Sequence, residues 1–164
     1  MTNQYSLLID IGGTDIKVGV IEVGESDLLS IKRYPTPTFL DLSGLKREIP
    51  PTMLMQTCLA AISQAEKSFG RFRTVALSGQ MGCWLITDAE NNPVSNIVSW
   101  QDKRADERMS NGCSFREFAQ AKYGNKSLIL AGNEMRSGLP LFGLFTFLHK
   151  AKRKEKFRFH SLIS

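Results

Sequence analysis

The chain has 164 residues, of which 42% are hydrophobic, and a formal net charge of +5. This length suffices for one substantial core or two small lobes, and no apolar segment reaches the roughly 18 residues of a membrane-spanning helix. The entire excess of positive charge falls in residues 150–158. A nucleic-acid-binding domain would spread its basic residues over the fold. We therefore interpret this segment as the solvated end of a helix and expect no nucleic-acid or membrane partner.

The N-terminus and the cysteines indicate a reducing compartment. Residues 1–10 contain no basic segment and no small-residue cleavage site, so we expect no secretory signal. Cys58, Cys83 and Cys113 are widely separated, and an odd number of cysteines argues against a disulfide framework. We therefore expect a cytoplasmic protein.

The first half of the chain predicts three strands and a helix. Residues 5–11 and 15–23 are rich in β-forming residues and are separated by a Gly-Gly pair, which is typical of a hairpin. A third extended run at 28–34 is followed by prolines and completes a meander. Apolar residues then recur at intervals of three and four over 52–69, after two prolines that favour a helix start.

The second half of the chain predicts three further strands, followed by helices. The strand-like segments, with a turn between the last two, are 73–79, 83–89 and 95–100. The helical segments are 101–109, 114–124 and 139–156. This order predicts an α/β fold whose mixed sheet opens with an antiparallel meander, and it does not match a Rossmann βαβ unit.

Residue types that suit a phosphate surround the first predicted turn, in the segment DIGGTDIK. Gly12 and Gly13 let backbone N–H groups approach an oxygen closely, and Thr14 adds a hydroxyl group. Lys17 supplies a point charge if it faces the turn. Asp10 is placed to hold a hydrated Mg²⁺ ion, because carboxylates and phosphates are the usual ligands of that metal. Turns of this kind also occur without a ligand, so the segment alone leaves both interpretations open.

A second group of motifs carries a family resemblance. Ser78-Gly79-Gln80-Met81 ends one predicted strand, an Asn-Asn-Pro turn follows the next, and Trp100-Gln101-Asp102 with Arg104 ends the third. In this order the motifs resemble the N-terminal domain of the FGGY family of carbohydrate kinases. The opening segment is likewise similar to that family's first phosphate motif, Asp-x-Gly-x-Thr-x-x-Lys/Arg. The resemblance covers nearly the whole chain and weakens after residue 110.

The resemblance implies a fold, a reaction and two sets of residues. The fold is ribonuclease H-like (actin-like ATPase), and the reaction transfers the γ-phosphoryl group of MgATP to a hydroxyl of a sugar or polyol. The residues implied to bind the ATP cofactor are Asp10, Gly12, Gly13, Thr14 and Lys17, with Asp10 beside the metal. The residues implied to bind the substrate are Gln80, Met81, Trp100, Gln101, Asp102 and Arg104. Aromatic, amide and carboxylate groups of this kind suit carbohydrate hydroxyls.

Several substrate-side candidates also have a plainer interpretation. Trp100 suits an ordinary core, and Met81 suits a filled gap. Asp102 and Arg104 suit the start and the solvated face of a helix. Gly82 stands where many family members carry a histidine. The resemblance therefore does not assign a particular family substrate, such as xylulose, to this chain.

The resemblance further implies that residues 1–164 are the N-terminal part of the family's N-terminal domain. The catalytic-base segment and the C-terminal domain would then lie outside this chain, so we expect no catalytic residue in it and no turnover by it alone. A homodimer is an expectation for the longer protein. Two alternatives stay open. The opening segment is also similar to the ROK family of glucokinases and repressors, and the fragment could be a non-enzymatic module that binds a sugar or a partner.

Overall fold

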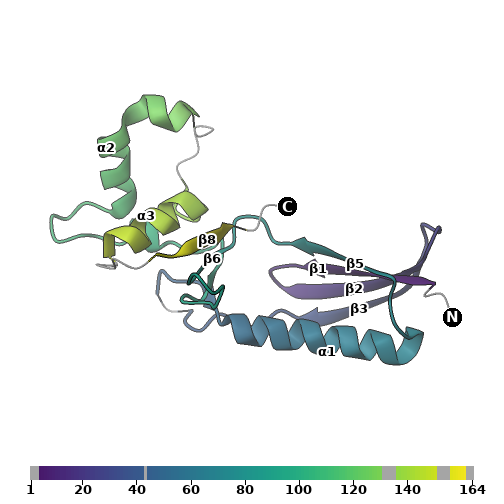
Figure 1. Ribbon diagram of the computed structural model, residues 1–164. Coiled ribbons are helices and arrows are strands. Elements are labelled where there is room, and N and C mark those ends of the chain that lie inside the picture. Colours follow the sequence, from purple (N-terminus) through teal and green to yellow (C-terminus); the bar gives the residue numbers. More distant parts are fainter. Residues whose placement is uncertain (1–3, 43, 131–135, 151–155, 162–164) are drawn as a thin grey trace. The chain divides into compact units, whose positions relative to one another are not determined.

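The computed structural model describes residues 4–42, 44–130, 136–150 and 156–161 (Figure 1). The described residues form two compact units. The first unit contains residues 4–38 and 50–81, and the second contains residues 39–49 and 82–161. No helix in the described part of the chain is both long and apolar enough to cross a membrane.

The first unit is a four-stranded sheet with one helix packed on it (Figure 1). Its elements are β1 (Tyr5–Ile11), β2 (Asp15–Glu22), β3 (Leu28–Pro35), α1 (Pro51–Phe69) and β5 (Thr74–Gly79). The strand order is β3-β2-β1-β5, in which β1, β2 and β3 form an antiparallel meander and β5 runs parallel to β1. This confirms the predicted meander, the predicted helix and the mixed sheet.

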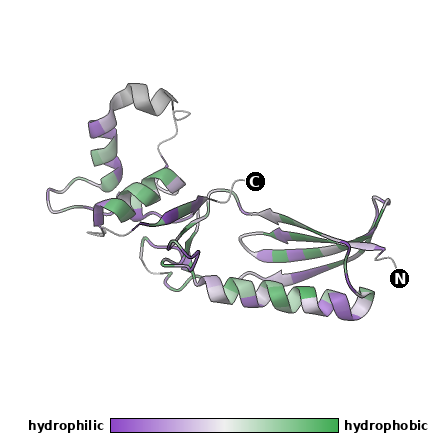
Figure 2. Cartoon of the chain, in the orientation of Figure 1, coloured by the Kyte–Doolittle hydropathy of each residue, from purple (hydrophilic) through white to green (hydrophobic). Residues whose placement is uncertain are grey.

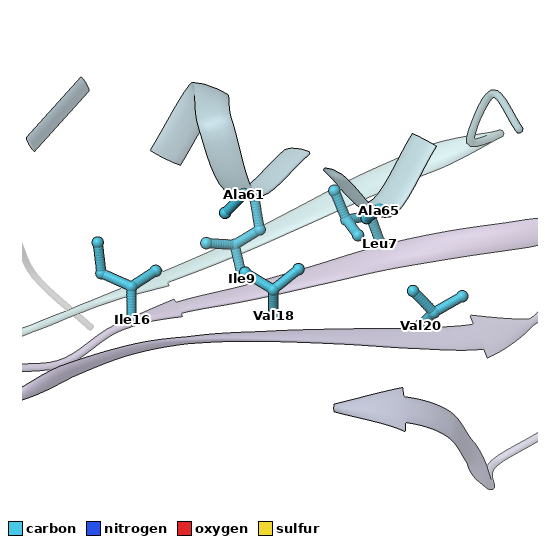
Figure 3. Close-up of a cluster of buried hydrophobic side chains, with 7 residues drawn as sticks. All are labelled: Leu7, Ile9, Ile16, Val18, Val20, Ala61 and Ala65. Atoms are coloured by element: carbon cyan, nitrogen blue, oxygen red, sulfur yellow. The ribbon is translucent and has the colours of Figure 1, made fainter. Parts of the chain in front are cut away.

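Alternating apolar residues explain how this sheet packs. Figure 3 shows side chains of β1 and β2 that point toward α1, where two alanines face them. The cluster consists of Leu7, Ile9, Ile16, Val18, Val20, Ala61 and Ala65. The small alanines let the helix approach the sheet closely, and each large buried side chain stabilises the fold by roughly 1.5–3 kcal/mol. By the same alternation, Ser6, Asp10, Asp15 and Lys17 occupy the opposite face.

The second unit contains a small antiparallel sheet, two helices and a short 3₁₀ helix. Its elements are β4 (Glu48–Ile49), β6 (Trp84–Thr87), β7 (Ile97–Val98), η1 (Arg104–Asp106), α2 (Phe115–Leu130), α3 (Pro140–Lys150) and β8 (Arg158–Ser161). The strand order is β4-β7-β6-β8. Trp84, Ile86 and Val98 form the core of this sheet, and the largely hydrophobic α3 (Figure 2) contributes Leu144 and Phe147 to it.

Two predicted elements of the second unit are wrong in extent. The strand predicted at 95–100 consists only of Ile97–Val98. The helix predicted at 101–109 is reduced to η1, because the carboxylate of Asp102 accepts the backbone N–H groups of Arg47 and Arg104. A side chain that binds backbone groups in this way competes with helix formation.

The later helices also differ from the prediction. The helix predicted at 114–124 begins at Phe115 and extends to Leu130, with a kink where Gly124 adopts a φ of 68°. The helix predicted at 139–156 is present from Pro140 to Lys150. Residues 151–155 of that prediction lie outside the described residues, and Lys156 is not helical.

The interpretation of residues 150–158 as a helix end is wrong for Arg158, which begins β8. The alternation of this strand explains the difference. Phe159 packs against Trp84, with ring centroids 5.6 Å apart, while Arg158 and His160 are exposed. A period of two residues favours a strand even when half of its side chains are basic or polar.

Candidate functional site

The turn between β1 and β2 is held by hydrogen bonds through its carbonyl groups. Gly12 N donates to Asp15 O at 3.0 Å within the turn. Thr36, just after β3, donates its hydroxyl to Gly12 O at 2.8 Å and its backbone N–H to Thr14 O at 2.9 Å. The N–H groups of Gly13 and Thr14 donate to no other residue that the structure describes, and both residues are exposed. Two backbone donors are therefore available to an anion, and successive N–H groups of this kind form anion-binding sites in proteins.

Asp10 and Lys17 lie beside this turn on the two strands that it joins. They are direct partners in the β1–β2 register, and Lys17 Nζ lies 3.4 Å from Asp10 Oδ2. Both side chains are about half exposed, at 48% for Asp10 and 43% for Lys17. An exposed ion pair of this kind contributes roughly 0–1 kcal/mol. Both groups can therefore turn toward a ligand at small energetic cost.

The surroundings of Asp10 suit a hydrated Mg²⁺ ion and do not suit a metal held by protein ligands alone. No group of three or more His, Cys, Asp or Glu side chains that could hold a metal ion occurs among the described residues. Mg²⁺ keeps several waters and is usually bound through one or two carboxylates together with substrate phosphates. One half-exposed carboxylate next to a turn with available N–H groups fits that arrangement.

Gln80 and Met81 follow β5 in the same unit. In the parallel pairing of β1 with β5, Ile11 is aligned with Gly79, so Gln80 comes next to the turn. A Cβ atom added at Gly13 would lie 2.8 Å from Gln80 Nε2, which means that the Gln80 amide occupies that space. Met81 is 66% exposed, and the interpretation that it fills a gap in the core is therefore wrong.

The remaining substrate-side candidates lie in the second unit and divide into exposed and buried residues. Trp100 is 46% exposed, so it is no ordinary core residue, and Gln101 is also exposed. Asp102 and Arg104 are buried, at 2% and 9% exposed. The alternative that Arg104 lies on the solvated face of a helix is therefore wrong, and Asp102, interpreted as a charge at the start of that helix, is buried just before η1.

The buried pair belongs to a network of charges. Arg104 Nε donates to Asp102 Oδ1 at 2.7 Å, and Arg104 NH2 donates to Asp102 Oδ2 at 2.8 Å. The same NH2 group donates to Glu48 Oε1 at 2.6 Å, and Asn96 donates to the other Glu48 oxygen. Burial alone would lower the pKa of Arg104, but the hydrogen bonds and charges of Asp102 and Glu48 outweigh it and raise that pKa. The carboxylates of Asp102 and Glu48 and the guanidinium of Arg104 therefore bind one another.

Two further contacts hold the backbone of the Trp100–Asp102 segment. A Cβ atom at Gly82 would lie 3.1 Å from Trp100 Cβ, and a Cβ atom at Gly138 would lie 1.7 Å from Trp100 O. The sequence interpretation missed Thr36 at the β1–β2 turn of the first unit, and it missed Glu48 and Gly138 beside the Trp100–Asp102 segment of the second unit. Each acts through a contact with a residue at least 20 positions away, and no local pattern indicates such a contact.

Solved structures similar to this one include three kinases. The crystal structure of gluconate kinase from Lactobacillus acidophilus has a TM-score of 0.78 and 16% identity, covering 94% of this chain and 31% of that protein. Plasmodium falciparum glycerol kinase with ADP has a TM-score of 0.76 and 17% identity, covering 90% of this chain and 29% of that protein. Ligand-bound xylulose kinase from Lactobacillus acidophilus has a TM-score of 0.73 and 15% identity, covering 89% and 28%.

These similarities establish the ribonuclease H-like (actin-like ATPase) fold. The chain spans about a third of the length of these proteins, and no curated protein matches its sequence. The family model for the N-terminal domain of the FGGY carbohydrate kinases matches residues 5–144, which favours the FGGY resemblance over the ROK alternative. The chain therefore belongs to the FGGY family of carbohydrate kinases, within the N-terminal domain.

Proposed function

We propose that a protein containing this chain transfers the γ-phosphoryl group of ATP to a hydroxyl of a sugar or polyol. The observation that supports this most strongly is the β1–β2 turn. Its carbonyl groups are bound by Thr36, its Gly13 and Thr14 N–H groups are available, and Asp10 and Lys17 lie beside it. Phosphoryl transfer depends mainly on positioning and on neutralising charge, and this group of residues is suited to both tasks.

Each residue of the turn would make a different contact with the phosphoryl group or its metal ion. The backbone of Gly12 and Gly13 would let the phosphate oxygens approach, and the Gly13 N–H, the Thr14 N–H and the Thr14 hydroxyl would bind them. Lys17 would leave Asp10 and supply positive charge, while Asp10 would hold Mg²⁺ through its hydration shell. When bound, the metal would neutralise charge that develops on the transferred group. The ADP in the glycerol kinase structure supports a nucleotide in this family.

The substrate side would be built from residues with two different tasks. Met81, Trp100 and Gln101 are exposed and would contact the carbohydrate directly. Asp102 and Arg104 are buried in their own network, so we propose that they support the segment that carries Trp100 and Gln101. The class of substrate is a carbohydrate or polyol, and gluconate, xylulose and glycerol are the first compounds to test.

The base that accepts the hydroxyl proton would lie outside residues 1–164, so this chain alone would not turn over. The test is to express both the chain and the longest in-frame product of its gene. ADP formation is then measured with each candidate sugar. We expect ADP only from the longer product and only in the presence of one of the sugars.

Two other outcomes have distinct meanings. ADP formation by residues 1–164 alone would contradict the placement of the base outside the chain. Sugar binding measured by calorimetry, without ADP formation by the longer product, would contradict the kinase proposal and favour a non-enzymatic binding module.

We also propose a cytoplasmic location, which is consistent with Cys58, Cys83 and Cys113 being free thiols. A homodimer of the longer protein remains a prediction. Light scattering of that protein would test it.

A further inference from the structure

Gln80 lies beside the β1–β2 turn, although the family resemblance assigns it to the substrate-binding residues. β5 runs parallel to β1, and the aligned pair Ile11 and Gly79 brings the residue after each strand to the same edge of the sheet. Around the Cβ position of Gly13, Gln80 Nε2 lies at 2.8 Å, and Cδ and Oε1 both lie at 3.4 Å. The planar amide therefore covers the α-carbon of Gly13. A side chain at position 13 would displace it.

Thr36 holds the same turn from the opposite neighbouring strand. β3 pairs with β2, and β5 pairs with β1, so the turn lies between the ends of these two strands. Thr36 binds the carbonyl groups of Gly12 and Thr14, and Gln80 packs over Gly13 between them. Fixing the carbonyl groups on one side also fixes the direction of the intervening N–H groups. Donors that are oriented before the ligand arrives lose little free energy to reorganisation.

We propose that Gln80 and Thr36 are positioning residues for the phosphoryl end of the site, and that Gln80 does not act as a sugar ligand. The proposal rests on the kinase function proposed above. Charge gives a way to distinguish the two roles of Gln80. A glutamate at position 80 would accept sugar hydroxyls as well as glutamine does, whereas beside Gly13 it would place a negative charge at the phosphate and repel it.

The first experiment measures steady-state kinetics of the longer, active product with Gln80→Glu. We expect KM for MgATP to rise by about tenfold or more and kcat to fall, while KM for the sugar changes by less than about twofold. Added salt should partly restore KM for MgATP, because the effect is electrostatic. The matched control is Gln56→Glu, an exposed glutamine of α1 that belongs to neither set of binding residues. It should leave KM for MgATP unchanged. A change confined to the sugar KM in Gln80→Glu would overturn the proposal.

Thr36 is tested by a pair of variants. Thr36→Val removes the hydroxyl that Gly12 O accepts, and Thr36→Ser restores it. We expect Thr36→Val to raise KM for MgATP and Thr36→Ser to recover at least half of the loss on a logarithmic scale. Equal behaviour of the two variants would show that the hydroxyl plays no part.

A second measurement needs no turnover and uses residues 1–164. Inorganic pyrophosphate is titrated into the ¹⁵N-labelled chain, and the amide signals of Gly13 and Thr14 are followed by NMR. We expect these two signals to shift in the wild type and to shift less in Gln80→Glu and Thr36→Val. Wild-type signals that do not respond, or variants that respond like the wild type, would overturn the proposal. Absence of ADP formation together with the expected NMR result would instead contradict only the kinase function.

Discussion

Arg104 donates three hydrogen bonds to Asp102, although only one residue separates them. The backbone N–H of Arg104 and its Nε both reach Asp102 Oδ1, and its NH2 reaches Oδ2. Asp102 Oδ2 also accepts a hydrogen bond from the backbone N–H of Arg47 at 2.7 Å, so the carboxylate binds a segment 55 residues away as well. Asp102 thereby fixes the chain immediately after Trp100 and Gln101, which are exposed.

Replacing Asp102 with alanine should destabilise the second unit strongly. The substitution leaves the Arg104 guanidinium buried with Glu48 as its remaining partner and leaves the Arg47 N–H without its acceptor. Breaking a buried ion pair from one side costs about 3–5 kcal/mol. The measurement is urea-induced unfolding followed by tryptophan fluorescence, because Trp84 packs directly against Arg104.

Lys103→Ala is the control for this substitution. Lys103 lies between the two residues and is exposed. Its backbone N–H donates to Leu45 O and its carbonyl accepts from Asp106 N, and alanine retains both hydrogen bonds. Its free energy of unfolding should change by no more than about 0.5 kcal/mol. A loss below about 1 kcal/mol for Asp102→Ala would show that the network does not stabilise the fold.

The start of α2 should weaken in acid. Ser114 and Glu117 form a capping box, in which Ser114 N donates to Glu117 Oε2 at 2.7 Å and Glu117 N donates to Ser114 Oγ at 3.1 Å. The first of these bonds is the main reason that the pKa of Glu117 is lowered from its usual 4.5. A lowered folded-state pKa stabilises the fold above the unfolded value, and this stabilisation is lost as the pH falls through the folded value.

Amide exchange of the first turn of α2, measured between pH 6 and pH 3 after correction for intrinsic rates, checks this. We expect protection to fall below about pH 4.5 in the wild type and to fall less steeply in Glu117→Gln, in which the Arg116–Asp106 ion pair still titrates at this helix start. Ser114→Ala should lose about 1 kcal/mol of stability at neutral pH. Wild-type protection that does not change with pH would contradict the role of the ionised Glu117.

Local patterns predicted the first unit well, because its elements depend on neighbours in sequence. The alternation of Leu7 and Ile9 in β1 and the spacing of Ala61 and Ala65 in α1 each identify the face that is buried. The Gly12-Gly13 turn was also recognisable from residue type alone. The two residues that constrain it were not, since Thr36 and Gln80 reach the turn only after β3 and β5 have paired.

The second unit was predicted less well, because the burial of its charged residues and the formation of its last strand depend on contacts between residues far apart in the sequence. Asp102 and Arg104 are charged residues at the predicted start of a helix, and their burial depends on the ion pair with Glu48, which lies 56 positions before Arg104. β8 was missed because basic residues surround Phe159. Here packing against Trp84 decided the structure, and local propensity did not.

Cys83 should react more slowly than Cys113. It is 5% exposed, and burial raises its pKa, although a hydrogen bond with the Trp100 backbone opposes this change. At pH 8 a smaller fraction of Cys83 is therefore thiolate than in an exposed cysteine, and a thiol reagent has little access to the buried sulfur. With a chromogenic disulfide reagent, Cys83 should react at least about tenfold more slowly than Cys113, which is partly exposed.

Single-cysteine variants separate these rates. Cys58→Ser combined with Cys113→Ser leaves Cys83, and Cys58→Ser combined with Cys83→Ser leaves Cys113. The two thiols should react at similar rates once the chain is unfolded in guanidinium chloride. Similar rates in the folded protein would contradict the burial of Cys83.

Gly138→Ala should disturb the segment that carries Trp100 and Gln101. The added Cβ would lie 1.7 Å from Trp100 O and 2.8 Å from Trp100 C, so the backbone of one segment would have to move. Overpacking against rigid atoms costs typically about 1–3 kcal/mol. We expect a loss of stability in this range or above, together with a changed emission maximum of Trp100, measured in a Trp84→Phe background.

Gly44→Ala is the matched control, because the nearest atom to its added Cβ is Asp41 Oδ2 at 3.2 Å, at the end of a flexible side chain. That substitution should change stability by less than about 1 kcal/mol and leave the Trp100 emission unchanged. If Gly138→Ala behaves in the same way, the close approach of Gly138 to Trp100 does not determine the position of Trp100. If it shifts the emission as expected, Gly138 joins Asp102 as a residue that positions the exposed Trp100 through its backbone.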